Sequence, residues 1–207
     1  MNAPHVNVPA ATTGSATTIA ERLAQYVAGF RYEDIPQATR ERAKLLILDA
    51  VGIALASTHY DFAHRVLTGL RALDEGGNSS LINLPGRLAV RDAVIMNGVL
   101  VHGLDYDDTH IRAIIHATAS AFPCALGVAE SVNAAGDALL AAYVLGIEVA
   151  TRISDAAGGR FHDFGFHPTG IAAHFSCALQ AGWLYGLTPR QLVMAQGLMV
   201  STAAGSQ

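Results

Sequence analysis

The stretch 45–55 reads LLILDAVGIAL, and Asp49 is its one charged residue. It continues a helical pattern that begins at Pro36, where the missing amide proton costs nothing because the first amides of a helix lack intrahelical partners. We expect this helix to run to about Ser57. Because its second half is apolar almost all round, we also expect it to lie at the centre of the fold.

Helical patterns fill most of the remaining chain. The first opens with Thr18-Ile19-Ala20-Glu21, a capping box in which the glutamate reaches back to the amide of the cap residue. Further helices are predicted over 61–74, 89–102, 117–133, 137–156, 170–185 and 189–204. The one segment typical of a strand, 80–84, is too short and isolated to found a sheet. The sequence therefore predicts an all-α, multi-helix domain over residues 18–207, preceded by a disordered arm over residues 1–17.

Composition narrows the class of partner. The chain is 51% hydrophobic with a mean hydropathy of +0.32, and such an apolar surplus is buried either in a membrane or against another protein surface. The run 164–189 has no Asp, Glu, Lys or Arg, but its Ala, Gly, His and Pro content favours a buried helix over a membrane-spanning one. The net charge of −4 argues against nucleic acid as a partner. We therefore expect no membrane and no nucleic acid.

The cysteines and the first residues suggest a compartment. Cys124 and Cys177 lie too far apart for a CxxC motif, so we interpret them as free thiols in a reducing environment. Residues 1–17 lack the basic region and apolar core of a secretion signal. A cytoplasmic location is the expectation.

The polar residues concentrate in one place. The stretch 102–110 reads HGLDYDDTH, and His116 follows it. In one interpretation, an aspartate orients a histidine, while Thr109 and a histidine contact a substrate. In the other, the aspartates cap the next segment by accepting backbone amides. Both stay open, with one aspartate structural in either case. A metal site is less favoured, because the spacing fits neither HExxH nor a calcium loop.

A second candidate is the histidine of the loop 165–169, which reads GFHPT. Pro168 restricts His167 to an extended backbone, and the helix predicted to begin near Gly170 would present its positive end to an anion. His167 then either lies beside a carboxylate-binding position, which we favour, or only forms hydrogen bonds within a loop that enters the helix. Arg112 could clamp a substrate carboxylate or be an ordinary surface arginine.

Together these motifs resemble the MmgE/PrpD family, in the order Asn97-Gly98, then 102–110, then His116, then 165–170. That family includes 2-methylcitrate dehydratase, cis-aconitate decarboxylase and iminodisuccinate epimerase. The resemblance implies a helical domain that returning C-terminal helices and an α/β lid domain complete elsewhere. It also implies a homodimer without metal or organic cofactor.

The resemblance also implies roles for single residues. Asp105, His116 and His167 match catalytic positions, and Thr109 matches a carboxylate-binding one; we place His102, His110 and Arg112 with the substrate-binding group. The implied activity is that of a lyase, a dehydratase or decarboxylase that moves protons alpha to a carboxylate of a small di- or tricarboxylic acid. An epimerase of the same family is the alternative.

This sequence departs from the family pattern at two points. Ala117 stands where the family usually has proline, and the family's downstream lysine has no counterpart, since Lys44 is the one lysine of the chain. The match covers about the first half of a family member, from Thr18 on. A further hypothesis is therefore a non-catalytic half-chain that needs a partner, a complementing chain, to supply the lid and the lysine.

Overall fold

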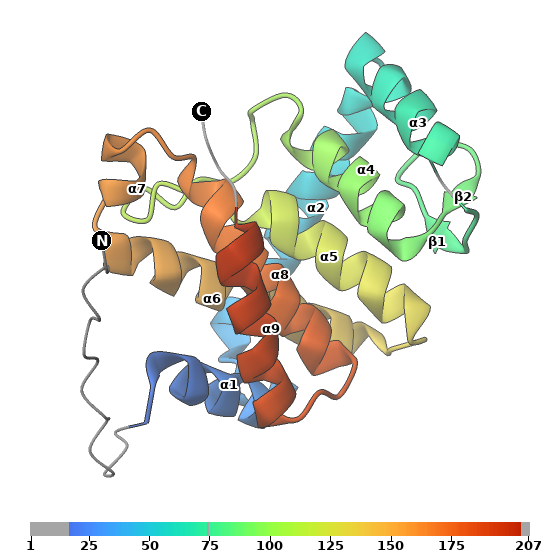
Figure 1. Ribbon diagram of the computed structural model, residues 1–207. Coiled ribbons are helices and arrows are strands. Elements are labelled where there is room, and N and C mark those ends of the chain that lie inside the picture. Colours follow the sequence, from blue (N-terminus) through green and yellow to red (C-terminus); the bar gives the residue numbers. More distant parts are fainter. Residues whose placement is uncertain (1–16, 74, 204–207) are drawn as a thin grey trace, which may run out of the picture.

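The protein is described by a computed structural model that covers residues 17–73 and 75–203. The predicted all-α class is confirmed (Figure 1). In chain order the elements are α1 (Ile19–Gly29), the short 3-10 helix η1 (Tyr32–Asp34), α2 (Gln37–Ser57), α3 (Asp61–Leu73), β1 (Ser79–Ser80), β2 (Arg87–Leu88), α4 (Val90–His102), α5 (Thr118–Ser131), α6 (Gly136–Ala157), α7 (Arg160–Asp163), α8 (Pro168–Leu184) and α9 (Pro189–Thr202). The arm predicted over residues 1–17 lies almost wholly outside the described residues.

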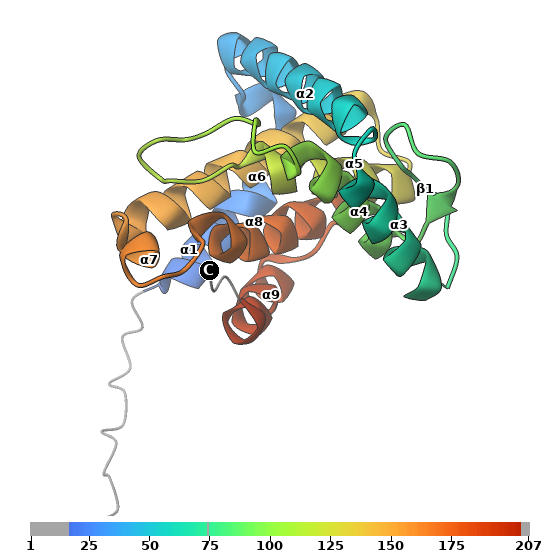
Figure 2. The same ribbon diagram turned by 90° about the horizontal axis from the view of Figure 1, so that it is seen from above.

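Helices α5, α6 and α8 pack against one another at the centre of the domain. Helix α5 packs against α4, α6 and α8, and α6 packs against α8 along much of its length. Helix α2 covers one side of this group, while α1 and α9 pack together on the side of α8 (Figure 2). Leu100, Tyr143 and Leu179 are completely buried in this interior, so burial of apolar surface stabilises it.

Buried side-chain hydrogen bonds tie the central helices together. The hydroxyls of Thr118 on α5 and Tyr143 on α6 lie 2.7 Å apart, and Nε2 of Gln180 on α8 donates to the carbonyl of Ala121 on α5 at 2.9 Å. Burial raises the pKa of Tyr143 well above its usual range, which keeps its phenol protonated. Buried polar groups with partners of this kind fix one relative placement of the helices.

The helix over 45–55 is not central, contrary to the expectation from its sequence. In α2 the small residues Ala50 and Ala54 face the interior, whereas Leu45 and Leu48 have 57% and 68% of their surface exposed. These leucines line a groove of about 650 Å³ together with Leu104 and other residues. An apolar helix is buried only where a neighbour covers each face, and within the described residues α2 has neighbours on one face.

Two smaller expectations also change. The segment 80–84 is not a strand; the pairing is a two-residue antiparallel hairpin between β1 and β2. The buried Asn97 of α4 holds this hairpin, because its amide donates to the carbonyl of Ser80 and accepts from the amide of Ile82. Between the helices predicted over 137–156 and 170–185, the structure has a further short helix, α7.

Two helices begin with a capping box. The one predicted at Thr18 is confirmed, and a second joins Thr188 to Gln191 at the start of α9. Among the described residues, no single helix has both the length and the apolar composition to cross a bilayer; α2 and α3, bent by 90° at their junction, meet both conditions only as a pair.

Candidate active site

Three helix ends meet at the candidate site. Helix α4 ends at His102, α5 begins at Thr118 after a long loop, and α8 begins at Pro168. The loop between α4 and α5 leaves the helix through Asp105, whose φ of +51° lies in the left-handed region. A non-glycine residue with this backbone conformation is uncommon and is often found at functional sites.

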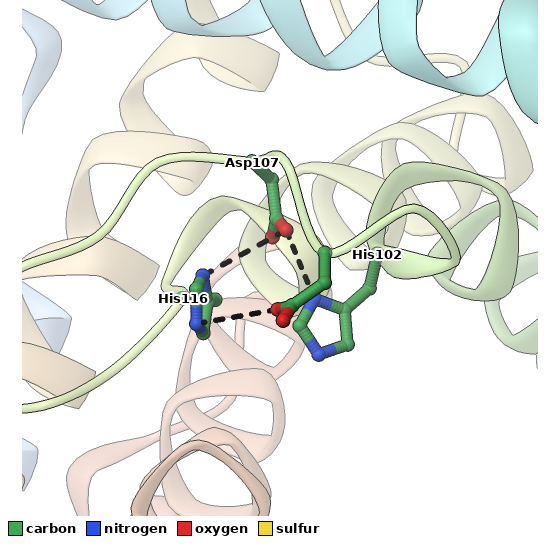
Figure 3. A group of neighbouring side chains, drawn as sticks. His102, Asp107 and His116 are labelled. Carbon is green, nitrogen blue, oxygen red and sulfur yellow. Dashed lines mark hydrogen bonds and ion pairs between the residues drawn. The ribbon is translucent and has the colours of Figure 1, made fainter.

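Asp107 forms the buried base of this site. Its side chain is 1% exposed, and Oδ1 accepts a hydrogen bond from Nδ1 of His102 at 2.9 Å. The same oxygen lies 3.7 Å from Nδ1 of His116. On the other side of that ring, Nε2 of His116 lies 3.7 Å from Oδ1 of Asp105, whose side chain is 81% exposed. Figure 3 shows the two imidazoles on either side of the Asp107 carboxylate.

His167 completes the group from the start of α8. Its backbone is extended, as the sequence predicts, but α8 begins at Pro168 and not near Gly170, so His167 is the N-cap residue of the helix. Its ring centroid lies 6.4 Å from that of His102, which in turn lies 5.0 Å from that of His116. A hydrogen bond joins the loop between α4 and α5 to the start of α8, since the backbone amide of His116 donates to the side-chain hydroxyl of Thr169 at 3.1 Å.

The surroundings move the pKa values of two histidines in opposite directions. The hydrogen bond to Asp107 raises the pKa of His102, because the carboxylate favours the charged imidazole. Burial, reinforced by the neighbouring His102 and His116, lowers the pKa of His167. Opposed shifts of this kind are typical of sites in which one group acts as an acid and another as a base.

The raised pKa of His102 links folding stability to pH. A histidine whose folded pKa exceeds its unfolded value stabilises the fold below the unfolded pKa, and this stabilisation is lost as pH rises through the folded pKa. We expect His102→Gln to lower the melting temperature more at pH 5.5 than at pH 9. Thermal unfolding of both proteins at the two pH values tests this, with His64→Gln on the exposed face of α3 as a control. Equal effects of His102→Gln at both pH values would contradict it.

The third aspartate of the motif, Asp108, has a structural role. Asp108 accepts the backbone amide of Thr118 at the start of α5, and burial raises its pKa. This contact fulfils the capping interpretation for one of the three aspartates. The structure thus separates the motif into a buried carboxylate, an exposed carboxylate and a helix-starting one.

Of the predicted substrate-binding residues Thr109, His110 and Arg112, one contacts a histidine of the site and two have other partners. Thr109 shares a hydrogen bond of 3.4 Å with Nδ1 of His116. Nδ1 of His110 instead accepts the amide of Ala113 within its own turn, and Arg112 forms an ion pair of 2.7 Å with Asp155 on α6. A substrate-binding role for His110 or Arg112 stays a prediction that the described contacts do not support.

The same groups have the donor set for a divalent cation. One ligand atom each from His102, Asp105, Asp107 and His116 lie within 4.8 Å of one another. Imidazole with carboxylate suits zinc and related transition metals. The hydrogen bond between His102 and Asp107 accounts for the closest of these approaches without a metal, so the geometry does not require one.

Comparison with known proteins now adds to this geometry. The model of the MmgE/PrpD N-terminal domain matches residues 21–207.

The chain belongs to the MmgE/PrpD family.

Curated relatives of this chain include cis-aconitate decarboxylases. A cis-aconitate decarboxylase of Aspergillus terreus is 25% identical over 202 residues, which are 94% of this chain and 41% of that protein. A cis-aconitate decarboxylase of Mus musculus is 26% identical over 192 residues, or 90% of this chain and 39% of that protein. The chain therefore spans about two fifths of the length of these relatives.

The main residue that the sequence left unassigned is Asp107. The motif offers three aspartates within four positions, and periodicity cannot say which of them turns inward at a helix end. A signal was present in the five-residue spacing from His102, since a loop that leaves a helix end can fold back over its last turn. The resemblance to the MmgE/PrpD family pointed to Asp105 instead.

Proposed function

We propose that this chain forms one wall of the active site of a lyase that acts on a small di- or tricarboxylic acid of the aconitate type. The observation that carries the proposal is the approach of His102 and His116 to the buried carboxylate of Asp107, with the ring of His167 beside that of His102 and opposed pKa shifts on these two rings. The names of the relatives support the substrate class, and decarboxylation is the favoured reaction.

The proposed chemistry uses only proton transfer. In decarboxylation, the bond between the alpha carbon and the departing carboxylate breaks, carbon dioxide leaves, and the electron pair stays on carbon. An imidazolium then donates a proton to that carbon and becomes neutral. In dehydration, a neutral imidazole instead removes the alpha proton, and hydroxide leaves with a proton from an acid. General acid–base catalysis of this kind contributes about 10²- to 10⁴-fold to a rate.

The residues divide between these tasks by their surroundings. The lowered pKa of His167 keeps its ring neutral and able to accept a proton near pH 7. His116 lies between Asp105 and Thr109 and is the second proton-transfer candidate. A substrate carboxylate would lie near Thr109 and the positive end of α8, because helix N-termini attract anions.

Two further aspects of the proposal concern the whole protein. The share of the relatives' length that the chain spans supports a site completed by a C-terminal region, in the same or another polypeptide, which supplies the lid and the lysine. We also propose a homodimer, a cytoplasmic location and independence of cofactors. Epimerisation is the alternative reaction, because it needs the same proton transfer without a leaving group.

Isotope exchange tests the proposed reaction. The protein is incubated in D₂O with cis-aconitate, 2-methylcitrate or a chiral amino-dicarboxylate, and products are followed by NMR. We expect deuterium at the alpha carbon together with carbon dioxide release from cis-aconitate, at equal rates with and without EDTA because imidazoles carry the protons.

The outcomes of this assay separate the alternatives. Deuterium exchange without loss of carbon dioxide or water would favour an epimerase. Activity that appears only when a C-terminal family region is added would favour the divided site. Absence of exchange and turnover in both preparations would count against the proposal.

A further inference from the structure

The contacts of Asp107 suggest a division of labour within the histidine cluster. His102 ends α4, and Asp107 lies five residues later, where the loop folds back over the helix end. One oxygen, Oδ1, receives the hydrogen bond from His102 at 2.9 Å and lies 3.7 Å from Nδ1 of His116. The second distance is too long for a hydrogen bond. In this arrangement the oxygen therefore bonds one imidazole and is within about 1 Å of bonding the other.

Burial distinguishes Asp107 from the other carboxylate that approaches His116. The Asp107 side chain is 1% exposed and that of Asp105 is 81% exposed. Water and salt screen a charge at the exposed position, whereas a buried charge acts on its neighbours with little screening. The second oxygen of Asp107, Oδ2, is buried and has no hydrogen-bond partner among the described residues. A carboxylate in this position depends on nearby positive charge.

We propose that Asp107, and not Asp105, is the positioning residue of this site, and that it holds one proton between His102 and His116, with His102 as its resting position. The hydrogen bond from Nδ1 fixes the tautomer of neutral His102, so that its Nε2 carries no proton. When Nδ1 passes its proton through Oδ1 of Asp107 to Nδ1 of His116, Nε2 takes one up from solvent, so His102 stays neutral and His116 becomes charged. When His116 becomes charged, the same oxygen is in reach to stabilise it. Neither His102 nor Asp107 need contact a substrate for this role.

The charged and titratable groups around the pair are consistent with this proposal. Asp105 and His116 approach it from the same loop, Asp108 lies beside Asp107, and His167 faces His102 from the start of α8. The principal cause that raises the pKa of His102 is its hydrogen bond to Asp107, while Asp105 has a smaller influence. Only the catalytic consequence of the proposal rests on the proposed function.

Histidine NMR tests the proposal in the protein without substrate. Ring ¹H–¹⁵N spectra are recorded across pH for the wild type, Asp107→Asn and, as the matched control, Asp105→Asn, with His102 assigned from the signal that His102→Gln removes. We expect the titration midpoint of His102 to fall by about one pH unit or more in Asp107→Asn. In Asp105→Asn it should fall by less than half as much. An equal or larger shift in Asp105→Asn, or no shift in Asp107→Asn, would overturn the proposal.

A second variant covers the case in which Asp107→Asn does not fold. The hydrogen-bonded Nδ1 proton of His102 should give a downfield signal that His102→Gln removes and Asp105→Asn retains. If that signal survives in His102→Gln, the shared proton does not rest on His102. Because these spectra need no turnover, they can fail or succeed independently of the isotope-exchange assay.

Turnover supplies a readout that a purely structural role would not change. We expect Asp107→Asn to lower kcat at least about 10-fold, to leave KM within about 3-fold, and to shift the pH profile of kcat. Asp61→Asn, at an exposed position of α3 where the carboxylate lies 3.6 Å from Arg65, should leave kcat and that profile unchanged. An unchanged kcat and profile in Asp107→Asn would refute the catalytic part of the proposal while leaving its NMR part to stand.

Discussion

Replacing His167 with glutamine is expected to lower turnover of an aconitate-like acid by about 10²- to 10⁴-fold. Glutamine has a similar reach and can form hydrogen bonds, but at neutral pH it can neither take up a proton nor release one, so it replaces the imidazole neither as a base nor, once charged, as an acid. The effect should fall on kcat, because the ring acts on the proton in transit more than on the bound substrate. Steady-state kinetics with cis-aconitate, with product followed by NMR, measures it.

The control for this substitution is His64→Gln. His64 is exposed on α3, and we expect its replacement to leave kcat within about 2-fold, as for a surface change away from the reacting groups. If His167→Gln retained kcat within the same range, His167 would not be a proton-transfer residue. Circular dichroism of both variants confirms that the comparison is made between folded proteins.

The second large effect concerns stability. Gly146 lies on α6 where this helix crosses α5 and α8, and a Cβ added there would collide with Oε1 of the completely buried Gln180 and lie 3.1 Å from Cβ of Ala121. Moving Gln180 would break its hydrogen bond to Ala121 and leave buried polar groups unpaired. We expect Gly146→Ala to lower the free energy of unfolding by about 2 kcal/mol.

The sign of that effect makes it informative. Alanine normally stabilises a helix by about 1 kcal/mol relative to glycine, and Gly52→Ala is the matched control because nothing lies within 4 Å of its added Cβ in α2. Urea unfolding should show Gly52→Ala as stabilising and Gly146→Ala as destabilising. Stabilisation by both would mean that Gln180 moves aside without cost.

The helices themselves could be predicted because their signals are local. Thr18 with Glu21 and Thr188 with Pro189 define helix starts from a few neighbouring residues, and the structure confirms both. The place of each helix in the fold depends on distant contacts. The leucines of 45–55 show this. Their spacing predicts an apolar helix, but it does not say which of its faces other described parts of the chain cover.

The site could be predicted in its members but not in their roles. His102, Asp105, His116 and His167 stand out by residue type, and the structure brings them together. Which aspartate turns inward depends on the left-handed backbone at Asp105 and on the path of the loop over the end of α4. Those features depend on packing, so the buried position of Asp107 became clear only in three dimensions.

The amide-to-hydroxyl bond between His116 and Thr169 joins two segments that arrive from different directions. His167 lies at the start of α8, and the other end of that helix leads into α9, which packs alongside α8. The distance between the rings of His167 and His102 is therefore set by the packing of a whole helix as well as by the loop. Because misplacement by about 1 Å can cost a catalyst about 10²-fold, the proposed proton transfer depends on how α8 packs as well as on the residues of the site.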